Sequence, residues 1–125
     1  MPAVQTYRDL DAWKMSMRLA KDCYRLTERF PVFERFGLTQ QIRRAAVSVA
    51  SNLAEGNARR TRQAYINHVN IAIGSLAELE TQIVLAAELG FVKAPEIEST
   101  QELARHTGKL MLALVHALEA SQVAS

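Results

Sequence analysis

The chain has 125 residues, of which 49% are hydrophobic and 22% are charged, as is typical of one globular domain with a stable core. Its single cysteine, Cys23, excludes an intramolecular disulfide, and no stretch reaches the roughly 18 consecutive apolar residues of a membrane span. The first residues lack the basic and apolar regions of a secretory signal, so we expect a cytoplasmic protein.

The net charge of +2 is distributed unevenly along the chain. Residues 1–62 hold 12 Lys/Arg and 6 Asp/Glu, a balance of +6, whereas residues 63–125 hold 3 and 7, a balance of −4. This asymmetry indicates either a basic face for an anionic partner or complementary faces that pair within an assembly.

Helix breakers and apolar spacing predict four helices, at residues 9–30, 38–55, 61–89 and 95–120. Pro31 ends the first helix, and the connector that follows is expected to hold one helical turn at Glu34. Thr39 is the expected N-cap of the second helix, and Gly56 and Gly90 are the expected C-terminal caps of the second and third. Because the connections are short, residues 1–125 are predicted to form a single all-α domain, an antiparallel up-down-up-down four-helix bundle.

The first predicted helix is apolar on two sides. One apolar face runs from Leu10 to Tyr24, and a second lies about 120° away at 100° per residue. Since one bundle core can cover only part of such a helix, we expect self-association through the second face. The alternative is that loops or the chain ends cover it. The residues expected at the oligomer interface are Met15, Leu19, Leu26 and Phe30.

The remaining surface of the same helix carries a line of cations, here called the basic strip: Lys14, Arg18, Lys21, Arg25 and Arg29. Five cations on one helix face can contact phosphates along a nucleic-acid backbone. The alternatives are a solvated surface or a source of salt bridges between subunits.

A second group of arginines, here called the link cluster, precedes the third helix: Arg59, Arg60 and Arg62. Arginine suits bidentate phosphate contacts, so both groups are predicted to bind nucleic acid. Aromatic residues are sparse around the link cluster, so base stacking there is not expected.

Glu80 interrupts the apolar pattern of the third predicted helix. A carboxylate among apolar positions must be paired or lie at an interface edge, and Arg44 is one candidate partner. The alternative of a catalytic acid lacks a second carboxylate or a nucleophile nearby.

Cys23 is interpreted as a small buried hydrophobe, and His68, His106 and His116 do not have the spacing of a metal site. We therefore expect no enzyme activity, no metal and no cofactor.

Three segments resemble a known family. The run from Gly37 to Gly56, GLTQQIRRAAVSVASNLAEG, is similar to the signature of the four-helix-bundle proteins encoded in 23S rRNA intervening sequences. The segments Leu10–Lys14 and Gly74–Gln82 also match that family's pattern. The family is similar in turn to the accessory variability protein of diversity-generating retroelements. The resemblance implies a four-helix bundle, assembly as a ring-like homopentamer, and, for the retroelement relatives, binding to nucleic acid and a reverse transcriptase.

The family motif contains a polar set within the second predicted helix: Arg44, Ser48, Asn52 and Glu55. We interpret this set, together with Glu80, as a structural network between helices or subunits. The alternative is a ligand site.

Taken together, the sequence predicts a non-catalytic homo-oligomer, pentameric by resemblance, that binds RNA or DNA backbone and has a possible protein partner. The second hypothesis is a scaffold whose basic and acidic faces serve self-assembly or protein contact only.

Overall fold

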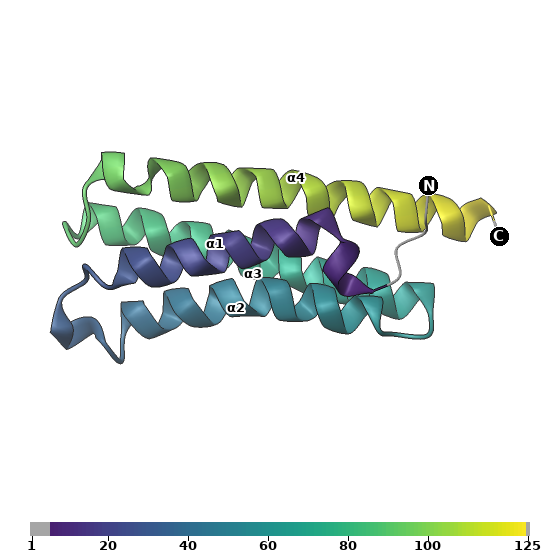
Figure 1. Cartoon of the computed structure of the whole chain (residues 1–125), viewed down its shortest axis with the longest axis horizontal. Coiled ribbons are helices and arrows are strands. Elements are labelled where there is room, and N and C mark those ends of the chain that lie inside the picture. Colours follow the sequence, from purple (N-terminus) through teal and green to yellow (C-terminus); the bar gives the residue numbers. More distant parts are fainter. Residues whose placement is uncertain (1–5, 125) are drawn as a thin grey trace.

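The computed structural model describes residues 6–124, with side chains described for residues 6–121, and contains four long helices and no strand in that range. They are α1 (Asp11–Thr27), α2 (Leu38–Asn57), α3 (Arg62–Glu88) and α4 (Ala94–Ala124). Two short 3-10 helices, η1 (Tyr7–Asp9) and η2 (Val32–Glu34), precede α1 and α2. The long helices run alternately up and down, and α4 also packs against α1, so the four enclose a single core (Figure 1). The prediction of an all-α antiparallel bundle is confirmed.

Both ends of α3 are stabilised by capping residues that can be recognised in the sequence. Thr61 caps α3 by accepting a hydrogen bond from the Ala64 amide at 3.1 Å. Gly90 follows α3 with a φ of +80°, and the amides of Gly90 and Phe91 return to the carbonyls of Ala87 and Ala86. This is the Schellman arrangement, and it needs a residue without a side chain at the left-handed position. Gly90 is therefore confirmed as a C-terminal cap.

Two other cap predictions are wrong. Thr39 is buried inside the first turn of α2, and the helix instead begins with the Leu38 amide donating to the Glu34 carboxylate at 2.7 Å. Gly56 lies within α2, which continues to Asn57, and it does not have a positive φ. A Cβ at Gly56 would approach the Cβ of His68 to 2.8 Å. This glycine therefore permits close contact between α2 and α3, rather than ending a helix.

The first helix is shorter than predicted at both ends. Tyr7–Asp9 forms the separate turn η1, and α1 ends at Thr27 because the amides of Arg29 and Phe30 bond three residues back, to Leu26 and Thr27. Such tightening precedes Pro31, whose ring restricts the residue before it. The expected single turn in the connector is confirmed as η2.

The second apolar face of α1 is covered within the chain. Leu19, Leu26 and Phe30 are buried in the core, with Leu19 at 0% exposure, and Met15 is half-buried beside Leu103 of α4. The expectation that these residues form an oligomer interface is wrong for the three core residues. A bundle helix has two helical neighbours, so α2 covers one side of α1 and α4 covers the other. Phe30, beyond the end of α1, is covered by Phe91 in the turn after α3, so the alternative of cover by a loop holds for that residue.

Aromatic rings join the two loops at one end of the bundle. Phe91, in the turn after α3, contacts Phe30 with ring centroids 5.7 Å apart and Phe33 of η2 with centroids 6.1 Å apart. Both connections lie at the same end of the molecule (Figure 1). The segment between α1 and α2 is therefore tied to the segment between α3 and α4.

By length and composition alone, α3 is apolar enough to cross a membrane, with a hydropathy of 1.3 in its most apolar window. Core helices of bundles pass the same test. Here α3 supplies Leu76, Leu79 and Ile83 to the core, and it also exposes Ile71, Leu85 and Leu89. The exposed residues become relevant to assembly below.

Replacing Gly56 with Ala should destabilise the protein by about 1–3 kcal/mol, because the new methyl group meets His68 and Tyr65, even though Ala favours helix. Gly74 is the matched control, since it lies in α3 with open space around its Cα. The Gly74→Ala change should raise stability by about 0.5–1 kcal/mol. Urea unfolding of both variants measures this contrast, and a Gly56→Ala variant as stable as Gly74→Ala would contradict the close contact.

Cys23 should be inert in the folded protein. Burial, with a smaller contribution from the charge of Asp22, raises the pKa of its thiol from 9.0 to about 12. The thiolate, which is the reactive form, is therefore rare at mildly alkaline pH. We expect an aromatic disulfide reagent to label Cys23 only after denaturant is added. Rapid labelling of the native protein would show that the thiol is accessible.

Because the folded pKa is raised, the contribution of Cys23 to stability is complete at neutral pH and falls as pH rises from 9.0 toward about 12.

Candidate nucleic-acid interface

The basic strip occupies the outward side of α1. Its four residues within α1, Lys14, Arg18, Lys21 and Arg25, are exposed, and at 100° per residue they fall within roughly a 60° arc opposite the buried face. Arg29, also exposed, lies two residues beyond the end of α1. The side chains of Lys14, Arg18, Lys21 and Arg25 make no hydrogen bond or ion pair with the side chains of residues 6–121. These four cations are therefore directed to solvent, as an anion-binding surface requires.

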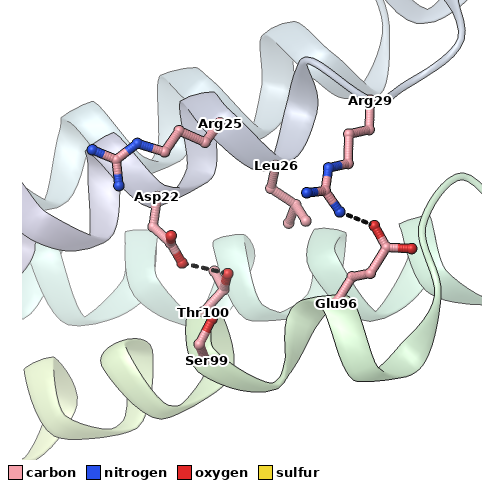
Figure 2. Close-up of a pocket in the computed structure, with 7 residues that line it drawn as sticks. All are labelled: Asp22, Arg25, Leu26, Arg29, Glu96, Ser99 and Thr100. Atoms are coloured by element: carbon pink, nitrogen blue, oxygen red, sulfur yellow. Dashed lines mark hydrogen bonds and ion pairs between the residues drawn. The ribbon is translucent and has the colours of Figure 1, made fainter.

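Arg29, the fifth cation of the strip, has a partner in α4. Its guanidinium pairs with the Glu96 carboxylate, and this pairing is the main reason that the pKa of Glu96 lies below its usual value (Figure 2). Nearby, Thr100 donates a hydrogen bond to Asp22 at 2.6 Å. These residues line a pocket of about 210 Å³ between α1 and α4, with Arg25 at its edge. The mixed charges make this flank of the strip a weaker site for an anion.

The link cluster lies at the bundle end where α1 begins, because α2 runs back toward that end (Figure 1). Arg59, Arg60 and Arg62 are all exposed. Arg59 donates from Nε to His68 Nε2 at 3.1 Å, which ties one cation of the cluster to α3. The link cluster is therefore a patch at one end of the bundle, near the end of α1 from which the basic strip starts.

A third basic region lies between α1 and α2 near the opposite end. Here called the arginine groove, it has a volume of about 390 Å³ and is lined by Tyr24, Arg35, Thr39, Gln40, Arg43, Arg44 and Val47. Its lining contains three arginines and no carboxylate. Glu28 lines a neighbouring pocket of about 220 Å³ that shares Arg35, Thr39 and Arg43. The arginine groove therefore brings three cations together on one concave surface without a carboxylate in its own lining.

Arg43 is fixed in this groove. Its guanidinium lies 4.5 Å from the centroid of the Tyr24 ring, and its Nε donates to the Thr27 hydroxyl at 2.8 Å. A further bond runs from Nη2 to the Tyr24 carbonyl at 3.4 Å. A cation over an aromatic face is attracted by the ring quadrupole, and the hydrogen bonds set its orientation. Because Tyr24 and Arg43 are 19 residues apart in the chain, this contact could not be predicted from residue spacing within one helix.

The polar set of α2 forms a network with α3. Asn52 donates to Ser48 Oγ at 3.1 Å, Ser48 and Ser75 hydroxyls are 2.8 Å apart, and Asn52 Oδ1 lies 3.1 Å from His68 Nδ1. His68 Nδ1 is also 3.7 Å from the Glu55 carboxylate. Because Arg59 donates to His68 Nε2, the proton of a neutral His68 ring lies on Nδ1 and is donated to Asn52 Oδ1. The interhelical hydrogen-bond network is found for Ser48 and Asn52, with His68 and Ser75 as the partners that sequence reasoning missed, and Glu55 lies at its edge.

Two residues predicted for this network lie outside it. Arg44 lines the arginine groove, and its side chain makes no hydrogen bond or ion pair with Ser48, Asn52 or Glu55. Glu80 is exposed, because the buried face of α3 runs through Leu76, Leu79 and Ile83 and leaves the next position on the surface. The expected Arg44–Glu80 pairing is therefore wrong. Within residues 6–121, no group of three or more His, Cys, Asp or Glu could hold a metal ion.

Comparison with known proteins agrees with this architecture. Residues 8–113 match the family described as 23S rRNA-intervening sequence protein. A crystal structure from Bacteroides thetaiotaomicron VPI-5482, described as a protein with unknown function from the S23 ribosomal protein family, is similar in fold. It has a TM-score of 0.75 and 21% sequence identity, over 83% of this chain and 97% of that chain. No curated protein matches the chain. Since the family match extends over most of its length, the chain belongs to the 23S rRNA-intervening sequence protein family.

Proposed function

We propose that this protein binds the phosphate backbone of RNA or DNA through the basic strip of α1, without catalysing a reaction. The observation that carries the proposal is the alignment of four exposed cations, Lys14 to Arg25, that have no partner in the described chain. Unpaired cations release counterions from nucleic acid on binding, which is the main source of sequence-independent affinity.

The dimensions of the strip fit this role. At 1.5 Å per residue, Lys14 and Arg25 are roughly 16 Å apart along the helix axis. One strand of B-DNA carries a phosphate about every 3.4 Å along its axis, so the strip can contact several successive phosphates. Such contacts position a strand and carry no direct base readout, so we expect little sequence preference from the strip alone.

The acidic residues of the chain favour one orientation of the nucleic acid. Glu96 pairs with Arg29 at the side of α4, and Glu102 pairs with Arg105 on α4 itself. The opposite flank of α1 leads to the arginine groove, which no carboxylate lines. A polyanion on the strip therefore meets neutralised ion pairs on the α4 side and three arginines on the α2 side, which favours contact toward α2.

Removing three cations of the strip should weaken binding of a labelled oligonucleotide and flatten its salt dependence. The variant is Lys14→Gln, Arg18→Gln and Lys21→Gln, and each lost phosphate contact should reduce the slope of log K against log salt by about 0.7–0.9. A control with the same charge change replaces Lys93, Arg105 and Lys109, which are exposed at the start of and along α4. Fluorescence anisotropy at several salt concentrations measures both.

The proposal fails on either of two results. The first is that the unmodified protein binds neither RNA nor DNA at about 50 mM salt, where screening is weak. The second is that the strip variant and the α4 control lose affinity equally, because net charge rather than the strip would then be responsible.

A second candidate function is a self-assembling scaffold, supported by the outer face of α3. Ile71 is 53% exposed and Leu89 is 54% exposed, and both lie on the same helix face as Leu85 and Glu78. The proposed occupant of this face is the α1 surface of a second copy, because exposed carboxylates of α3 and α4 complement the cations of the strip.

Assembly of this kind should respond to both apolar contacts and salt. Replacing Ile71 and Leu85 with Gln should shift the protein to monomer in sedimentation velocity, whereas replacing the exposed Leu112 of α4 should not. A monomeric unmodified protein at micromolar concentration would exclude the scaffold. The pentamer, and the reverse transcriptase or other protein partner implied by the resemblance to retroelement proteins, stay predictions.

A further inference from the structure

The arginine groove combines two features that backbone binding does not need, namely a flat stacked surface and a concave shape. Tyr24 is 42% exposed and Val47 is 44% exposed, so the groove has apolar surface as well as its three arginines. Simple phosphate contact needs only exposed cations, such as those of the basic strip. An apolar wall beside guanidinium groups matches a ligand with both a planar apolar part and an anionic part.

The Tyr24–Arg43 stack is prepared before any ligand arrives. The Arg43 guanidinium is held by the Tyr24 ring and by the Thr27 hydroxyl, which is buried in α1 and itself donates to the Cys23 carbonyl at 2.9 Å. A planar group fixed in this way loses little conformational freedom on binding. Nucleobases stack on aromatic rings and on guanidinium planes in the same manner.

The position of the groove connects it to the basic strip. Tyr24 lies between Lys21 and Arg25 in the sequence of α1, about 60° around the helix from Lys21. A strand that follows the strip therefore passes the groove. Arg35 and Arg44, which also line the groove, are placed to meet the phosphate of a nucleotide whose base enters it.

We propose that the arginine groove holds one unpaired nucleotide of an RNA or DNA strand, with its base against the Tyr24–Arg43 stack and its phosphate at Arg35 and Arg44. This inference rests on the proposed function and adds a preference for single strands. In a duplex, each base is already stacked and paired, so its face is not free to enter the groove. An unpaired base is free to do so.

The test compares labelled oligothymidylate alone, the same strand annealed to oligoadenylate, and an abasic strand with the same number of phosphates. Tyr24→Leu removes the ring, and Arg43→Lys keeps the charge but removes the guanidinium plane. Each change should weaken binding of oligothymidylate about tenfold, as expected for loss of one base stack. Binding of the duplex and of the abasic strand should not change. Phe36→Leu is the control, because Phe36 is an aromatic residue at the bundle end that is 84% exposed.

Several outcomes would overturn the inference. If Tyr24→Leu binds oligothymidylate as tightly as the unmodified protein, the groove does not hold a base, and the proposed function is untouched. If it weakens all three probes equally, the effect is a general loss of binding. If the unmodified protein binds no probe, the proposed function itself fails.

Thymidine monophosphate should compete better than inorganic phosphate, and equal competition would indicate a site for phosphate alone. Thermal unfolding of each variant confirms that these surface changes leave the fold intact.

Discussion

Burial of α1 on two sides is the constraint on which the rest of this structure depends. Leu19 and Leu26 face the core with no significant exposure, while α2 and α4 close over the two flanks of the helix. Only one outward arc remains for charged side chains, so all the cations of α1 must lie there. The alignment of the basic strip is therefore a consequence of how the bundle packs, and the arginine groove forms where the α2 flank meets that arc.

The fold could be predicted because its signals are local. Helix breakers such as Pro31 and Gly90 act on their own neighbours, and a period of 3.6 residues separates buried from exposed positions within each helix. The same period shows that a helix has two apolar sides without showing what covers them. A fourth helix and a second subunit produce the same pattern for Met15 and Leu26. At that step the interface prediction failed for Leu19, Leu26 and Phe30, and for Met15 it stays a prediction.

The candidate site was predictable only where its residues share a helix. The basic strip repeats every three or four residues, so the sequence displays it directly. The Tyr24–Arg43 stack and the Asn52–His68 contact join different helices, and their spacing depends on the register between those helices. Gly56 shows the same limit in the backbone, because a glycine at a close helix crossing and a glycine that ends a helix look alike in sequence.

The ring contacts around Phe91 have a thermodynamic consequence for Arg35, which follows η2 in the connection between α1 and α2. Fixing the backbone of a loose loop costs about 1–2 kcal/mol per residue, and a flexible connection would lose that amount whenever it met a ligand. In this protein the connection is already ordered on folding, because Phe91, almost sixty residues further along the chain, packs against Phe30 and Phe33. For the ligand proposed to bind the arginine groove, the contacts of the α3–α4 turn would therefore remove part of the entropic cost of ordering Arg35.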